Sequence, residues 1–255
     1  MNETPLVRRS FIFLPGVGAA TERRIWGSGI RDWGSFVEAE RVAPLNPSRK
    51  KGCDDIIIET EERLRERDLT YLSRLFKGTD TWRLYDTLAE DAVFLDIETT
   101  GTRRTSPITV VGVYGKNGYD AAIRGKDLDG ERISSMLEDT SMVITFNGGS
   151  FDLPMIEHQF PGSLPRIPHL DLRWLARRCG LTGGLKSIEV KMGISRPDDV
   201  KGMSGEDAVR LWRLFERRSN RNALKLLLKY NREDIVNLRP LTEMLVEESR
   251  RRLFE

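Results

Sequence analysis

Residues 92–101 read AVFLDIETTG, and this stretch decides the fold. The apolar residues 93–95 predict a buried strand. Side chains alternate along a strand, so Asp96 and Glu98 project from the same face. Two neighbouring carboxylates repel each other and lose hydration unless a cation lies between them. An edge strand with a solvated acidic face is the alternative, but the apolar run before the pair favours a divalent cation held by oxygen ligands.

Two further acidic residues follow at strand and helix positions. Residues 142–146 predict a second apolar strand, which continues into NGGSFD, where two glycines allow a sharp turn. Asp152 therefore falls at the start of a helix expected over residues 153–159. Residues 226–238 have helical spacing, which puts Tyr230 and Asp234 on one face. Taken singly, Asp152 would be an N-cap and Asp234 a solvated acid, so their value lies in the combination.

The ordered set of D-x-E, N-x-x-x-F-D and Y-x-x-x-D resembles the DEDD superfamily of 3′–5′ exonucleases. The Tyr230–Asp234 spacing resembles the DEDDy branch, whereas the DEDDh branch would place His where Lys229 stands. More narrowly, FLDIETTG, ITFNGGSFDLP, HLDL and YNREDIVNL resemble the exonuclease domain of the YprB type, over residues 90–245. The resemblance implies an α/β fold with a ribonuclease-H-like mixed β-sheet flanked by helices.

The remaining pattern suits such a fold. Residues 107–114 and 119–123 predict two strands joined by a hairpin turn at 115–118. A helix is expected near residues 128–138. Beyond residue 180 the pattern is mostly helical, with helices expected at 185–192, 205–217 and 222–251. Three antiparallel strands followed by strand–helix alternation predict an α/β sheet closed by helices.

The chemistry expected of the four carboxylates is phosphodiester hydrolysis. Asp96, Glu98, Asp152 and Asp234 are predicted to hold two ions, which would supply a nucleophile and stabilise the leaving oxygen. Because these ligands are hard oxygens without Cys or His, Mg²⁺ or Mn²⁺ is expected rather than Zn²⁺. Tyr230 is predicted to orient the attacking water, with a half-buried packing tyrosine as the alternative.

Residues beside the carboxylates are candidates for substrate binding. Thr99 and Thr100 follow the acidic pair and could contact a 3′-terminal sugar, although they would equally make an ordinary turn. Asn147 could hydrogen-bond the terminal nucleotide and Phe151 could stack on its base, with a core position as the alternative for Phe151. Asp171, in the HLDL segment, is expected to cap a helix and is left out of the catalytic set.

The N-terminal residues 11–20, FIFLPGVGAA, carry a second signal. Leu-Pro-Gly-Val-Gly resembles the hairpin of a helix-hairpin-helix motif. Gly16 and Gly18 would let backbone N–H groups approach a phosphate of nucleic acid at a helix N-terminus. One alternative is a small helical cap without a ligand. Another is a twin-arginine export signal from Arg8 and Arg9, which the prolines, glycines and charges that follow disfavour.

Charge and composition suggest three parts: a helix-hairpin-helix-like module at 1–53, a helical connector at 54–89 and the exonuclease domain at 90–255. Residues 1–53 hold nine basic and five acidic side chains, and residues 54–90 hold six and ten, within a chain of net charge +2. Residues 54–76 are expected to form one amphipathic helix. Several basic residues could flank a bound strand: Arg103, Arg104, Lys186, Arg196, Arg217, Arg218, Arg221 and Lys225.

The 255 residues suffice for a sizeable core plus a small appendage. No apolar run of about 18 residues predicts a membrane helix, and Cys53 and Cys179 form no C-x-x-C pattern, which suits a cytoplasmic protein. The resemblance implies a metal-dependent 3′–5′ exonuclease that releases nucleoside 5′-monophosphates from single-stranded DNA, in a setting such as DNA repair. RNA end-trimming is one alternative, and a catalytically silent nucleic-acid-binding subunit is another.

Overall fold

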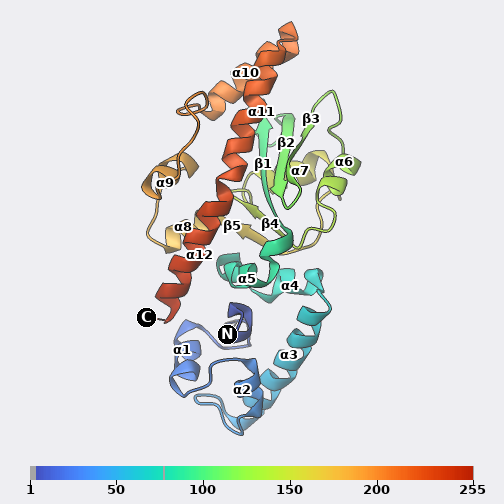
Figure 1. Cartoon of the computed structure of the whole chain (residues 1–255). Helices are drawn as coiled ribbons and strands as arrows, with labels where there is room; N and C mark the ends of the chain where they lie inside the picture. The colour runs from blue at the N-terminus through green and yellow to red at the C-terminus, as the bar shows by residue number, and fades with distance from the viewer. Residues whose placement is uncertain (1–3, 77, 255) are drawn as a thin grey trace. The chain divides into compact units, whose positions relative to one another are not determined.

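Figure 1 shows the computed structural model of the chain, which describes residues 4–76 and 78–254. The chain divides into two compact units. One comprises Met1–Ala89 with Arg166–Pro168, and the other comprises Glu90–Pro165 with His169–Glu255. We call them the N-terminal unit and the sheet unit and describe each by itself.

The N-terminal unit is helical, and polar side chains cap the starts of α2, α3 and α4. Asp32 and Ser35 form a capping box before α2, and Asn46 caps α3, where Pro47 takes the first position. The elements are η1 (Leu6–Arg9), α1 (Ala19–Gly27), α2 (Trp33–Glu38), α3 (Pro47–Arg65), α4 (Leu69–Leu75), η2 (Gly78–Leu84) and α5 (Tyr85–Leu88), with η3 (Ala89–Asp91) leading into the sheet unit.

The single helix expected over residues 54–76 is wrong. Helix α3 ends at Arg65, and Arg67 adopts a left-handed φ of 55°. Asp68 then accepts a hydrogen bond from the backbone N–H of Tyr71 and starts α4 as its N-cap. The local capping bond therefore prevails over the continuous amphipathic pattern.

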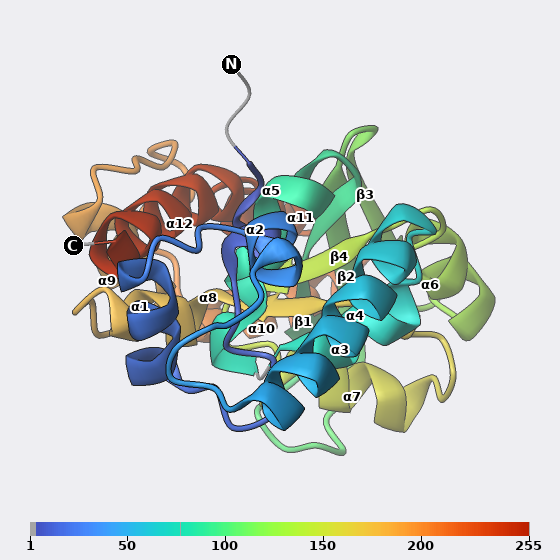
Figure 2. The same ribbon diagram turned by 90° about the horizontal axis from the view of Figure 1, so that it is seen from below.

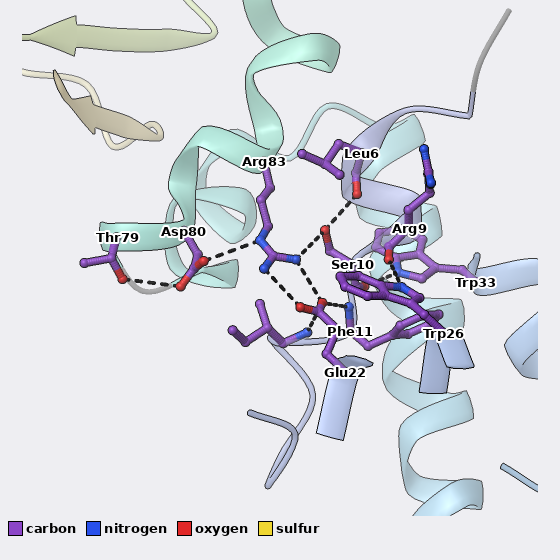
Figure 3. A network of polar contacts seen from close by, with 11 residues as sticks. Leu6, Arg9, Ser10, Phe11, Glu22, Trp26, Trp33, Thr79, Asp80 and Arg83 are labelled. Carbon is purple, nitrogen blue, oxygen red and sulfur yellow. Dashed lines mark hydrogen bonds and ion pairs between the residues drawn. The ribbon is translucent and has the colours of Figure 1, made fainter. Parts of the chain in front are cut away.

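A buried polar network joins the start of the N-terminal unit to η2 (Figure 3). Glu22 of α1 accepts hydrogen bonds from the backbone N–H groups of Phe11 and Ile12, at 2.6 and 3.0 Å. It also accepts two from the guanidinium of Arg83, at 2.9 and 3.0 Å. Arg83 and Glu22 are both fully buried. Arg83 of the predicted connector is thus neutralised by Glu22 of the predicted module. The boundary between module and connector at residue 53 remains a prediction.

The sheet unit contains a five-stranded mixed sheet in the order β3-β2-β1-β4-β5. The first three strands pair antiparallel, whereas β1 with β4 and β4 with β5 are parallel, which confirms the predicted α/β class. The strands are β1 (Ala92–Thr99), β2 (Ile108–Gly115), β3 (Gly118–Ile123), β4 (Met142–Thr145) and β5 (His169–Asp171). The helices are α6 (Gly130–Met136), α7 (Asp152–Gln159), α8 (Leu172–Arg178), α9 (Leu185–Lys191), α10 (Gly205–Arg218), α11 (Arg221–Val236) and α12 (Leu238–Phe254).

Helices cover both faces of this sheet. Helix α11 crosses one face and α7 lies on the other, as the two views agree (Figures 1 and 2). On the α11 side, Leu227 and Tyr230 pack with Val110 and Ile123 of the sheet and with Trp212 of α10. This packing fixes the helix that carries Tyr230 and Asp234 against the strand that carries Asp96 and Glu98.

The helix expected over residues 222–251 is divided at Asn237 into α11 and α12. Pro240 has no N–H group to donate to the carbonyl of Val236 four residues earlier, so the helical hydrogen-bond pattern is interrupted there. No helix among the described residues is both long and apolar enough to cross a membrane.

Candidate metal centre

The acidic pair lies at the carboxyl end of β1. Asp96 pairs with Gly112 and Glu98 pairs with Val110 on the antiparallel strand β2. The register then shifts between Glu98 and Thr99, which marks an irregularity directly after the acidic pair. The predicted DxE strand is therefore present, and both side chains lie on the α11 face.

Three carboxylates meet at this place. Three carboxylate oxygens lie within 4.8 Å of one another, one each from Asp96, Glu98 and Asp234. Glu98 and Asp234 are buried, and Oε1 of Glu98 has no hydrogen-bond partner among the described residues. An unpaired buried carboxylate oxygen is costly. The donor set, made of hard oxygens around an orphaned buried atom, fits a divalent cation such as Mg²⁺ or Mn²⁺.

Asp152 lies beside this trio but is held separately. It is the first residue of α7, and Phe151 takes the N-cap position that the sequence alternative gave to Asp152. Its Oδ1 accepts a hydrogen bond from the backbone N–H of Ile97, the residue between Asp96 and Glu98, at 3.1 Å. Burial raises the pKa of Asp152 to about 7.

The electrostatics of the cluster reflect crowding of like charges. Burial, and after it the charge of Asp152, raises the pKa of Asp96 well above its ordinary value. Burial, and after it the charge of Asp234, does the same for Glu98. Burial also raises the pKa of Asp234 against the opposing effect of Arg196. These shifts show that the carboxylates interact, and a bound cation would relieve their repulsion.

Asn231 positions Asp96. Its Nδ2 donates to Oδ2 of Asp96 at 2.9 Å, and its Oδ1 accepts a hydrogen bond from the hydroxyl of Tyr119 at 2.9 Å. Gly112 makes room for it, because a Cβ at that position would lie 1.9 Å from Oδ1 of Asn231. The sequence gives a signal for Asn231, since it follows Tyr230 in the Y-x-x-x-D segment, but its role appears only in the fold.

Tyr230 is buried at the same centre. Its hydroxyl accepts a hydrogen bond from Nζ of Lys186 at 2.8 Å, and this ammonium lies 4.5 Å from the centroid of the tyrosine ring. Burial, and after it the charge of Asp234, raises the pKa of Tyr230 above its ordinary value. With the carboxylates un-neutralised, the phenol therefore stays protonated at neutral pH and can donate a hydrogen bond.

Two of the basic residues expected to flank a bound strand point into the site instead. Lys186 contacts Tyr230 and the backbone carbonyl of Met203. Arg196 forms ion pairs with Asp234 and Glu189, and its side chain is only 6% exposed. Sequence spacing could not assign these roles, because Lys186 and Arg196 are far along the chain from Asp234 and have no periodic relation to it.

The loop between β4 and α7 is fixed by Asp171. Its two carboxylate oxygens accept hydrogen bonds from the backbone N–H groups of Asn147 and Gly149, at 2.7 and 3.1 Å. Asp171 also caps α8 by accepting from the N–H of Arg173, as expected. Asn147 adopts a positive φ of 69°, and its Oδ1 accepts from Nη1 of Arg173 at 2.6 Å. Its amide oxygen is thus engaged within the protein.

The other predicted substrate contacts lie nearby in the chain. Thr99 donates its hydroxyl to the carbonyl of Gly101 at 2.6 Å, and the N–H of Thr100 donates to the carbonyl of Pro107 at 3.0 Å. Both threonines are half-buried, as is Phe151. Their contact with a nucleotide stays a prediction.

In the N-terminal unit, the predicted hairpin leads into α1. Gly16 has a φ of 69°, and Gly18 is the N-cap residue of α1 in extended conformation. Nη2 of Arg49 donates to the carbonyl of Pro15 at 3.2 Å, beside Gly16. A phosphate contact of Gly16 and Gly18 stays a prediction.

Comparison with known proteins places these residues in a family context. A family model described as the RNase H superfamily matches residues 93–246. No curated protein matches the chain.

The solved structures that are similar to it include the following three. An apo form of a nuclease shares 19% identity over 70% of this chain and 80% of its own, with a TM-score of 0.49. The family B DNA polymerase of the hyperthermophilic archaeon Pyrobaculum calidifontis shares 15% over 60% of this chain and 24% of its own, with a TM-score of 0.48. Escherichia coli RNase D, an exoribonuclease involved in structured RNA processing, shares 20% over 67% of this chain and 43% of its own, with a TM-score of 0.47. Similarity at this level carries no substrate or activity to this chain.

Proposed function

The chain belongs to the RNase H superfamily, and we propose from this premise that it is a metal-dependent 3′–5′ exonuclease of the DEDDy type. Its proposed substrate is the 3′ end of single-stranded DNA, and its products are nucleoside 5′-monophosphates. The preference for DNA, the polarity and the products follow from the resemblance of its motifs to the YprB-type exonuclease domain.

One observation carries the proposal. Oxygens of Asp96, Glu98 and Asp234 come together within 4.8 Å, around a buried oxygen of Glu98 without a hydrogen-bond partner among the described residues. Three carboxylates in such proximity, two of them buried, are unfavourable for folding by themselves. A site that accepts this cost is typical of function, and hydrolysis assisted by divalent cations is the chemistry that this donor set supports.

We propose that Asp96, Glu98, Asp152 and Asp234 hold two Mg²⁺ or Mn²⁺ ions. When bound, such ions lower the pKa of a water and neutralise charge on the phosphate. Asn231 holds the Asp96 carboxylate in place by its hydrogen bond.

Tyr230 is proposed to donate a hydrogen bond that orients the attacking water. Its raised pKa keeps the hydroxyl protonated, which suits a donor rather than a general base. Lys186 donates to the phenolic oxygen and the phenolic hydrogen is shared with Asp234, so donation to the water requires the hydroxyl to exchange that contact.

Substrate contacts are proposed from the loops around the site and from the N-terminal unit. Thr99, Thr100 and Phe151 are proposed to contact the terminal nucleotide, the last of them by stacking. Asn147 is proposed to do so as a donor through Nδ2, because its Oδ1 accepts from Arg173. The backbone at Gly16 and Gly18 is proposed to bind phosphate.

The test is incubation of the full chain with DNA and RNA strands labelled at either the 3′ or the 5′ end, in Mg²⁺, Mn²⁺ or EDTA. We expect stepwise loss of nucleotides from 3′ ends of single-stranded DNA with either metal and none in EDTA. An Asp96→Asn variant serves as the matched control for contaminating nuclease. Faster degradation of RNA would reassign the substrate.

No degradation of any strand would contradict the proposed activity and favour a silent binding subunit. Thermal unfolding separates this outcome further, since a metal that binds only the folded state raises the melting temperature. A silent fold without metal sites would show no such increase.

A further inference from the structure

Arg196 reaches the metal centre from a loop and is held there by Glu189. One edge of its guanidinium donates to Glu189, from Nε to Oε2 and from Nη2 to Oε1, each at 2.7 Å. The remaining Nη1 donates to Oδ1 of Asp234. All three side chains are at most 11% exposed. The guanidinium thus lies between a structural carboxylate and a proposed metal ligand.

The chain is folded locally so that this contact forms. Helix α9 ends at Lys191, and Gly193, two residues further on, has a φ of 73°. The N–H of Ile194 donates to the carbonyl of Glu189, and the N–H of Gly193 donates to that of Val190. These two bonds form a Schellman motif, which reverses the chain and brings Arg196 back toward Glu189.

Glu189 is also tied to the helix that carries Asp234. Its Oε1 accepts a second hydrogen bond, from Nδ2 of Asn237 at 3.0 Å. Asn237 follows Asp234 by three residues at the end of α11. Glu189 and Arg196 therefore form a bracket between α9 and α11, and Arg196 has little freedom to leave it.

We propose that Arg196, held by Glu189, is a positioning residue that fixes the Asp234 carboxylate and leaves one of its oxygens to a divalent cation. The inference rests on the proposed function for the presence of the metal. A carboxylate with one oxygen engaged by a guanidinium cannot rotate freely and presents its second oxygen in a defined direction. Because Glu189 neutralises Arg196, the guanidinium can do this without adding a full positive charge next to the cation.

The fork shape of Arg is essential to this role, so a variant that keeps the charge isolates the geometry. Arg196→Lys keeps the charge, but the three N–H donors of an ammonium share one nitrogen and cannot replace the three guanidinium nitrogens that reach Glu189 and Asp234. A second variant, Glu189→Gln with Arg196→Gln, removes both charges and keeps the net charge of the site. Arg132→Lys is the matched control, since Arg132 donates to both oxygens of Asp120 on β3.

The measurement is the affinity of the folded full chain for Mn²⁺, by titration calorimetry without nucleic acid, beside thermal unfolding in EDTA. Outer partners of metal ligands typically contribute about 10–100-fold to affinity, and we expect at least tenfold weaker Mn²⁺ binding for Arg196→Lys and for the double variant. The control should stay within twofold of the wild type. If Arg196→Lys fails to fold, the double variant decides.

Two results would overturn the inference. Mn²⁺ affinity within twofold of wild type, with a lower melting temperature in EDTA, would make the bracket merely structural. Tighter Mn²⁺ binding would make Arg196 a competitor of the cation. The outcomes also separate the two proposals, because weaker Mn²⁺ binding without cleavage by the wild type would sustain the inference and reject the exonuclease. A wild type that binds no Mn²⁺ would reject both.

Discussion

Asn231 donates a hydrogen bond from Nδ2 to Oδ2 of Asp96 across 2.9 Å and so links α11 to β1 at the metal centre. The contact depends on a missing side chain. Gly112 lies opposite Asp96 on β2, and a Cβ there would lie 1.9 Å from Oδ1 of Asn231 and 2.6 Å from Cδ1 of Ile235. The helix can approach the sheet closely only because residue 112 is glycine.

We expect Gly112→Ala to lower both stability and activity. The added methyl group must displace Asn231 or shift α11, and such overpacking typically costs about 1–3 kcal/mol. Thermal unfolding and single-turnover cleavage measure the two effects. Gly115→Ala on the same strand is the control, because its Cβ would meet Cγ2 of Val93 at 3.2 Å, a milder contact. Equal effects of the two substitutions would contradict the role of Gly112.

Replacement of a proposed metal ligand should abolish cleavage and leave the fold intact. We expect Asp96→Ala, Glu98→Ala, Asp152→Ala and Asp234→Ala each to reduce the single-turnover rate to near background, because each removes a ligand. Circular dichroism checks that the variants are folded. Asp152→Ala also removes the hydrogen bond that the carboxylate accepts from the N–H of Ile97, so it should be the least stable of the four variants. Near-wild-type rates in two variants would refute the two-metal assignment.

The metal-free protein should lose stability as the pH rises. An unfolded carboxyl group loses its proton near about pH 4, whereas burial and then neighbouring charges raise the pKa of Asp96 and Glu98 in the folded chain. Between these values the folded state binds more protons than the unfolded state, so the free energy of unfolding falls with increasing pH. We expect a lower melting temperature in EDTA at pH 8 than at pH 5, and Mn²⁺ should reverse part of the decrease.

Glu98→Gln should reduce this pH dependence, because it removes one of the interacting charges. Glu131→Gln on α6 is the control, since Glu131 is exposed and far along the chain from the cluster. If the melting temperature falls by the same amount between pH 5 and pH 8 in wild type and Glu98→Gln, repulsion within the cluster does not cause the loss of stability.

Tyr230→Phe should keep the ring packing and slow cleavage. A positioned group that handles a proton typically contributes about 10²–10⁴-fold, and a hydroxyl that only orients water should fall at or below about 10²-fold. The measurement is the single-turnover rate at saturating metal and substrate, with Tyr114→Phe as the control. An unchanged rate would reduce Tyr230 to a packing residue.

Gly18→Val should weaken binding of nucleic acid with little effect on the bond-breaking step. Deletion of residues 1–53 would be a poor test, because it removes Glu22 and with it two hydrogen bonds of the buried Arg83 guanidinium. Gly18 is better suited, since a Cβ there would meet nothing within 4 Å and its φ of −103° suits any residue. Gly27→Val, at the other end of α1, is the control.

Affinity across a salt series measures the effect of Gly18→Val. Loss of a phosphate contact lowers the affinity and makes the salt dependence shallower, whereas the single-turnover rate should change little. Equal affinity and equal salt slope in wild type and both variants would make the hairpin a structural cap.

The sequence predicts those site residues whose spacing follows the repeat of a strand or a helix. Alternation along β1 places Asp96 and Glu98 on one face, and a spacing of four places Tyr230 and Asp234 on one face of α11. The three antiparallel strands follow from the same alternation, and the mixed sheet flanked by helices follows from the family resemblance. The helix ends at Arg65 and Val236 are missed, because the left-handed Arg67 and Pro240 interrupt patterns that are otherwise continuous.

The polar residues that hold the site in place, such as Arg196 and Asp171, have no regular sequence spacing from the residues they contact. Arg196 and Asp234 are 38 residues apart, and the Schellman turn at Gly193 and the hydrogen bond from Asn237 to Glu189 bring them together. Likewise, the sequence indicates a cap at Asp171 but not its second task, since the amides of Asn147 and Gly149 reach it only through the pairing of β4 with β5.

The double engagement of Asp171 has a consequence for genetics. The same carboxylate starts α8 and holds the loop through which the chain enters α7, and with it Asp152. A substitution at Asp171 would loosen that loop and let the fourth carboxylate drift from its neighbours. A selection for inactive alleles should therefore recover Asp171 together with the metal ligands, and its alleles would be mistaken for active-site lesions by phenotype alone.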